Sequence, residues 1–188
     1  MIVVAIIGIL AAVAVPGFMQ YIKDSKTSEA KDNMKAIGDG AIAFFEAEHV
    51  YDAAGMTPQS RLYPGGNELG TAYAAVATNI AVGGCGTPGQ KNSPASLGDV
   101  LNTPPWKHLK FQVTKPFYYQ YNYISDGATA GASTFNASAV ASLNVDADSG
   151  FTLAGTEAGQ IGNIIDVTPS GSEAIDAGSS FTTCEDTL

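Results

Sequence analysis

The chain opens on nineteen residues without a charge or a side chain that forms hydrogen bonds, MIVVAIIGILAAVAVPGFM. An apolar run of eighteen or more residues is typical of a helix that crosses a membrane, because lipid offers no partner for backbone polar groups. At ~1.5 Å per residue the run spans roughly 28 Å, slightly less than a hydrocarbon core of ~30 Å. Pro16 lies inside it and predicts a kink, since proline removes a backbone donor and presses on the carbonyl of Ala12.

The helical pattern continues beyond the apolar run and becomes one-sided. Apolar residues recur at spacings of three and four, with charged residues between them, as in Ala30, Met34, Ile37, Ala41, Phe44 and Phe45. We therefore expect one long helix with a first half that is apolar on every side. Its second half would carry a domain.

These residues resemble the N-terminal helix of type IV pilins and the related pseudopilins. The resemblance rests on MIVVAIIGILAAVAVPGF followed by KDSKTSEAKDNMKAI. In that family a Phe-Thr-Leu-Ile-Glu-Leu-like stretch and a basic leader, which a prepilin peptidase cuts before methylating the new N-terminus, precede this segment. Met1 falls where the family has an interior hydrophobic residue. Either the start is assigned late, which we favour, or the chain has lost the glutamate that the resemblance implies is used in docking subunits.

The resemblance implies an α+β pilin fold, with the long helix packed on an antiparallel sheet of about four strands. The expected segments are a hydrophobic half-helix at 1–22, an amphipathic half-helix at 23–53, a variable loop region at 54–105, and a sheet with a C-terminal loop at 106–188. Within the loop region, Leu69, Tyr73, Val76 and Ile80 keep helical spacing and predict a short helix. Ser93-Pro94 predicts another helix start.

The strands are expected to begin near Trp106. Alternation at Leu109, Phe111 and Val113 predicts one strand, which would form a hairpin with a second strand bearing Phe117, Tyr119, Tyr121 and Tyr123. A second hairpin is expected at 141–153 around a turn at 146–150, and one further strand at 161–167. The tyrosine stripe is interpreted as core, the alternative being an exposed platform for stacking sugars.

Charge is distributed unevenly, and this argues against binding to nucleic acid. The net charge is −9, and all nine Lys and Arg residues lie at or before Lys115. The charged residues of 116–188 are therefore all Asp or Glu. A face without cations cannot release counterions from phosphates. Two cysteines, Cys85 and Cys184, predict a disulfide outside the cytoplasm, with two free thiols as the alternative.

Other chemical motifs are weak. Gly84-x-Gly86-x-x-Gly89 follows no strand, and Glu46-x-x-His49 lacks the rest of a di-iron set. Asp146 and Asp148 form a weak calcium candidate, for which a hairpin turn is the simpler interpretation. Asn136-Ala137-Ser138 matches a glycosylation sequon by chance frequency. With two histidines far apart, the sequence indicates neither an enzyme nor a cofactor.

The sequence therefore predicts a structural subunit of a type IV pilus serving adhesion, motility or aggregation. Assembly would run through Val3, Val4, Ile6, Ile7, Ile9, Leu10, Val13 and Pro16. The expected partner is the chain itself, and the resemblance adds the prepilin peptidase, a platform protein and an assembly ATPase. The expected location is the inner membrane as a single-pass precursor, then the cell surface.

Three alternatives stay open: a minor pilin or type II secretion pseudopilin, a membrane-tethered or secreted binding module, and a signal peptide cut after Ala14. Lys23 and Lys26 follow the apolar run directly. Taken alone, these lysines would leave the domain in the cytoplasm, and the basic leader of the family would reverse that orientation.

Overall fold

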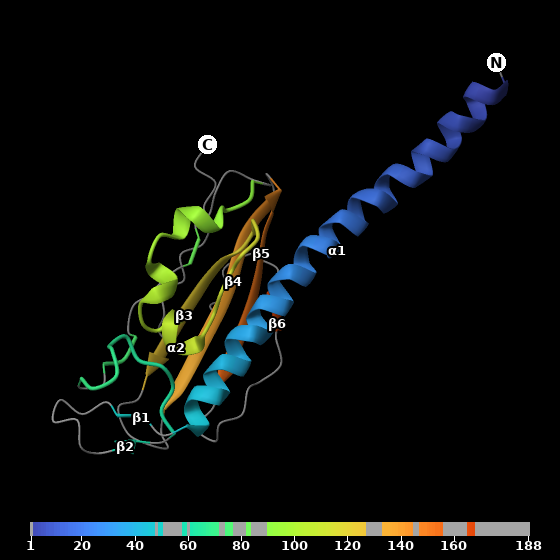
Figure 1. The fold of residues 1–188 in the computed structure, drawn as a ribbon. Helices are drawn as coiled ribbons and strands as arrows, with labels where there is room; N and C mark the ends of the chain where they lie inside the picture. The colour runs from blue at the N-terminus through green and yellow to red at the C-terminus, as the bar shows by residue number, and fades with distance from the viewer. Residues whose placement is uncertain are drawn as a thin grey trace.

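The computed structural model describes residues 2–47, 49–50, 58–59, 61–71, 74–76, 82–83, 90–126, 133–144, 147–155 and 165–167. Its dominant element is helix α1, Ile2–Glu46, which projects well beyond the rest of the molecule (Figure 1). The helix is uninterrupted at Pro16, and its ribbon shows no sharp bend, so the predicted kink is not seen. Within the described part of the chain, no helix meets the length and hydropathy that spanning a membrane requires.

The second half of α1 packs on a sheet through one apolar face. Buried side chains recur three, four or one residue apart, which places them along one stripe of the helix. They are Ala30, Met34, Ile37, Ala41, Phe44 and Phe45. The predicted amphipathic pattern is confirmed by this burial, and it explains why the domain holds only this half of the helix.

The sheet is antiparallel and has the strand order β3-β4-β5-β6. Its strands are β3, Gln120–Asp126; β4, Thr134–Asn144; β5, Ala147–Gly155; and β6, Ile165–Val167. A separate pair joins β1, His49–Val50, to β2, Pro58–Gln59. Helices combined with an antiparallel sheet confirm the predicted α+β class. The predicted boundaries at residues 22, 53 and 105 stay predictions.

Aromatic rings form the centre of the core between α1 and the sheet. Fully or almost fully buried rings include Phe117, Tyr119, Tyr121 and Tyr123, so the interpretation of this stripe as core is confirmed. Trp106 and Phe111 pack at its side, with ring centroids 5.4 Å apart. Small residues of β4, Ala137, Ala139 and Ala141, are also buried, and their size leaves room for the rings.

The predicted strand at Leu109–Val113 is wrong. Trp106–Leu109 form the short helix α2, and Lys110 follows in the left-handed conformation, with φ 54° and ψ 28°. Left-handed backbone breaks the alternation of a strand. Trp106 and Leu109, three residues apart, are both buried because one helical turn places them on the same side.

Two short 3-10 helices precede α2: η1, Pro94–Leu97, and η2, Val100–Asn102. The start predicted at Ser93-Pro94 is confirmed, with Ser93 as N-cap residue and proline in the first turn. Gly40 allows α1 to approach α2 closely, because a Cβ at this glycine would overlap the carbonyl oxygen of Leu109. The contact therefore brings the two helix backbones together.

Two further predictions need correction. Val76 forms an antiparallel bridge to Ser125, so it is not part of the predicted helix over 69–80, whose Tyr73 and Ile80 lie outside the described residues. Val82 and Asn92 continue this edge contact by bridging to Tyr121 and Phe117. Val76 and Val82 thus lie along β3, where hydrogen bonding to a strand edge outweighs helical spacing.

The second predicted hairpin is present, but residues 147–150 of its predicted turn belong to β5. Asn144 of β4 pairs with Ala147 of β5, and residues 148–150 already belong to the strand. Gly150 pairs with Val140 on one side and Val167 on the other. The polar residues Asp148 and Ser149 therefore do not form a turn. Of the strand predicted at 161–167, the described part is Ile165–Val167.

Candidate functional site

The largest exposed apolar surface in the described residues is the first half of α1. Its large side chains are 53–77% exposed, at Ile2, Val3, Val4, Ile6, Ile7, Ile9, Leu10, Val13, Val15, Phe18 and Tyr21. Outside α1, Leu69 is the one large hydrophobic side chain of the described residues with comparable exposure, at 43%. We call residues 2–21 the apolar half of α1.

The exposed side chains surround the helix instead of forming a stripe. Successive residues of an α-helix are rotated by about 100°, so Ile2, Val3 and Val4 point to three different sides. A single flat partner would cover one of these sides and leave the others in water. The surface therefore fits an environment that surrounds the helix, such as a bundle of several similar helices.

The energy available from covering this surface is large. Full burial of one Val, Leu, Ile or Phe side chain contributes roughly 1.5–3 kcal/mol. The ten such side chains here are each about two thirds exposed, so covering them represents on the order of 10–20 kcal/mol before the entropic costs of association. A second feature favours close packing. A Cβ built at Gly8 meets nothing within 4 Å, so its backbone is open to a neighbouring helix.

The predicted assembly residues thus share one exposed surface, although their role in assembly stays a prediction. Val3, Val4, Ile6, Ile7, Ile9, Leu10 and Val13 all belong to it. Pro16 lies within α1, and its side chain is outside the described set.

The apolar half meets the domain at a polar region, which we call the neck and define by Lys26, Glu29, Asn33, Lys91 and Tyr118. Glu29 Oε1 accepts a hydrogen bond of 2.9 Å from the Tyr118 backbone N–H. The ammonium groups of Lys26 and Lys91 each lie 4.8 Å from the Tyr118 ring centroid. These contacts join the helix to the chain just before β3.

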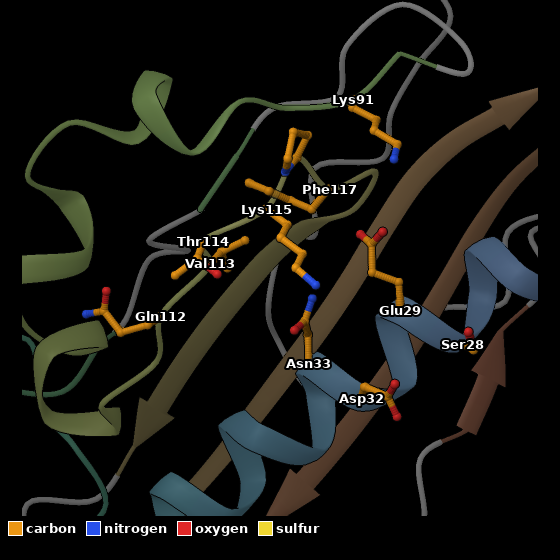
Figure 2. Close-up of a pocket in the computed structure, with 11 residues that line it drawn as sticks. Ser28, Glu29, Asp32, Asn33, Lys91, Gln112, Val113, Thr114, Lys115 and Phe117 are labelled. Carbon is orange, nitrogen blue, oxygen red and sulfur yellow. The ribbon is translucent and has the colours of Figure 1, made fainter.

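Beside the neck is a hollow of about 680 Å³ between α1 and the segment 112–117 (Figure 2). Both signs of charge line it, from Glu29 and Asp32 on the helix and from Lys91 and Lys115 opposite. Burial raises the pKa of the Glu29 carboxyl, while the Tyr118 hydrogen bond and the charge of Lys91 act in the opposite direction. Asn33 Nδ2 donates a 2.7 Å hydrogen bond to the Tyr121 hydroxyl oxygen next to it.

Sequence reasoning missed the neck, because its contacts join residues 88 and 89 positions apart. A weak signal is present in the sequence. Glu29 and Asn33 are polar residues on the turns that bear the buried Ala30 and Met34. A polar side chain beside a buried stripe is a candidate for a contact with the packed domain.

The other predicted sites are not brought together in the described residues. Cys85, Cys184 and Asp146 lie outside them, and Asp148 is placed only as a backbone position in β5. Among the described residues no group of three or more His, Cys, Asp or Glu could hold a metal ion. Asn136 of the sequon is half-buried in the middle of β4, paired with Ile124 and Ala154.

His49 belongs to a packed aromatic contact instead of a metal site. Its ring stacks on Phe44 with centroids 3.6 Å apart, and His108 stacks on the same phenylalanine at 5.3 Å. Burial lowers the pKa of both imidazoles, so the neutral form is favoured in the fold.

Comparison with known proteins supports the expectation from the sequence. Over 86 residues the chain is 41% identical to the type IV major pilin protein PilA of Myxococcus xanthus (strain DK1622), a match covering 44% of this chain. The match covers 37% of that relative, so this chain spans well under half of its length. No family model matches the chain, and no solved structure matches it. The predicted resemblance of this chain to type IV pilins is confirmed by the match to PilA.

Proposed function

We propose that this chain is a structural subunit of a type IV pilus filament. The observation that carries the proposal is the apolar half of α1, exposed on every side and attached to a folded domain. A filament of identical subunits supplies what this surface lacks, because helices of neighbouring copies can surround it. The similarity to a major pilin supports the same assignment.

The division of α1 explains how one helix serves two purposes. From Ala30 onward one face of the helix is buried against the domain, so the domain holds the helix from that point. Residues 2–21 project from the domain, and their large apolar side chains that the structure describes are exposed (Figure 1). The domain would then lie outside a central bundle of helices, where it can contact surfaces or other cells.

The finer parts of the proposal follow the sequence. Before assembly the chain would reside in the inner membrane, a stage that rests on the uncharged run of residues 1–19 and not on the structure. A prepilin peptidase, a platform protein and an assembly ATPase are the expected machinery. The role of this chain itself would be structural and not enzymatic, and the expected tasks are adhesion, motility or aggregation.

Composition of surface filaments tests the proposal. Filaments are sheared from the cells that produce this chain, purified and analysed by peptide mass spectrometry. Peptides of this chain should dominate the filament fraction. Filaments without the chain would refute the proposal. Traces of it in filaments, or its presence only in the membrane fraction, would favour a minor pilin or pseudopilin, and a free monomer cut after Ala14 would favour a secreted module.

A further inference from the structure

The neck marks the position on α1 where the domain begins to hold the helix. Tyr21 is 71% exposed, whereas Ala30 and Met34 are fully buried. Between them, Lys26 contacts the Tyr118 ring and Glu29 accepts the Tyr118 N–H. The next polar contact, from Asn33 to Tyr121, lies one turn further along α1. Glu29 therefore makes a polar contact at the start of the held part of the helix, one residue before the buried stripe begins at Ala30.

Glu29 is a carboxylic acid in a half-buried position, so its charge state affects this contact. Three groups from the domain face the carboxyl. They are Lys91, from the segment before η1; Tyr118, two residues before β3; and Tyr121, in β3. Lys26 and Asp32 are its charged neighbours on α1, and Lys115 lines the same hollow (Figure 2). Lys91 favours the carboxylate, but burial favours the neutral acid more strongly.

We propose that Glu29 makes the neck a pH-sensitive clasp, which holds α1 most tightly when the carboxyl is protonated and eases when the carboxylate forms. The neutral acid keeps a carbonyl oxygen that accepts the Tyr118 N–H, so closure does not require the charge. The carboxylate accepts the same bond but adds a charge that is half removed from water. A rise in pH thus loosens the attachment of the helix without disturbing the apolar core.

The direction of the effect follows from linkage. The pKa of Glu29 is raised in the fold, so the folded neck binds the proton more readily than the open neck does. The contribution is complete below the ordinary value of 4.5 and is lost as the pH rises through the raised pKa. Lys91 limits the loss, because its cation compensates part of the carboxylate charge.

The Tyr118 amide proton provides a direct measurement, since the amide donates its hydrogen bond to Glu29. The full chain, unassembled and held in detergent micelles, is labelled with ¹⁵N. Amide exchange is then followed from pH 4 to pH 8 and corrected for the intrinsic pH dependence of exchange. We expect protection of the Tyr118 amide to fall severalfold as the pH rises. The Tyr121 amide, which donates to Val82, should show no such change.

Two variants make the test specific. Glu29→Gln keeps an oxygen acceptor and cannot ionise, so protection at Tyr118 should stay constant over the pH range. Asp32→Asn is the matched control, because Asp32 lies in the same turn and lines the same hollow. It should retain the dependence of the parent chain. The proposal is overturned if the parent shows no change in protection, if Glu29→Gln retains the change, or if Asp32→Asn abolishes it. Because the protein is unassembled, the result is independent of whether filaments form.

Discussion

Two glycines in the same helix provide a sharp test of how α1 is divided. At Gly40 an alanine Cβ would overlap the carbonyl oxygen of Leu109, and the carbonyl carbon would also be unusually close, at 3.1 Å. At Gly8 an added Cβ meets nothing within 4 Å. Gly40→Ala and Gly8→Ala therefore make the same chemical change with opposite surroundings.

The expected magnitudes follow from these contacts. Glycine to alanine in a helix interior stabilises by roughly 0.5–1 kcal/mol when there is room. Overpacking of a filled site costs typically ~1–3 kcal/mol, and the upper end applies at Gly40 because the obstacle is backbone and cannot rotate away. The net effect of Gly40→Ala is a loss of about 2 kcal/mol in the free energy of unfolding.

Thermal unfolding of the full chain in detergent, followed by near-UV circular dichroism, measures the difference. A loss of about 2 kcal/mol corresponds to a decrease of roughly 4–8 °C for a domain of 150–250 residues. Gly8→Ala should leave the unfolding temperature of the domain unchanged, because the apolar half contributes nothing to its core. Equal unfolding temperatures for Gly40→Ala and the parent chain would refute the close contact between α1 and α2.

Three further outcomes are expected. Tyr121→Phe removes the acceptor of the Asn33 amide and should cost about 1 kcal/mol in unfolding free energy, whereas Tyr21→Phe, at an exposed position, should cost nothing measurable. Acidification should lower the unfolding temperature as the pH falls below 6.5, because the pKa of His49 and His108 is lowered in the fold and the unfolded chain takes up protons first. Replacement of both histidines by Gln should remove this decrease of unfolding temperature with falling pH. An unchanged decrease would show that the two histidines do not cause it. Lys107→Ala breaks an exposed ion pair with Glu68 and should leave the unfolding temperature unchanged within error.

The parts of the fold that follow from periodic burial could be predicted from the sequence. The stripe from Ala30 to Phe45 and the rings from Phe117 to Tyr123 repeat with the periods of a helix and of an extended chain, and both are buried. Such patterns can be read from the sequence because side chains at the period of a helix or a strand lie on one face, and that face packs against the core. The resemblance to the pilin helix also predicted that the apolar half lies outside the domain core, although periodicity alone is equally compatible with burial inside a domain.

The failures lie where one residue or one distant contact decides the local structure. Lys110 in the left-handed conformation ends α2 and breaks the alternation from Leu109 to Val113, and its side chain gives no signal of this. Val76 is held by Ser125, so its spacing from Leu69 carries no helical meaning. The neck joins Glu29 to Tyr118 across 89 positions, a separation over which a single sequence shows no correlation.

In a filament, copies of the chain would bury the apolar half of α1 in one another. We would test this burial by the yield of sheared surface filaments from cells that express Ile6→Lys, compared with cells that express Leu69→Lys. Both positions expose a large apolar side chain, one in the apolar half and one on the domain. A lysine at position 6 would place a charge inside the helix bundle, at a cost of several kcal/mol per subunit. We expect Ile6→Lys to abolish filaments and Leu69→Lys to preserve them, with equal amounts of each chain in the cells. A normal filament yield from Ile6→Lys would show that the apolar half is not buried between subunits.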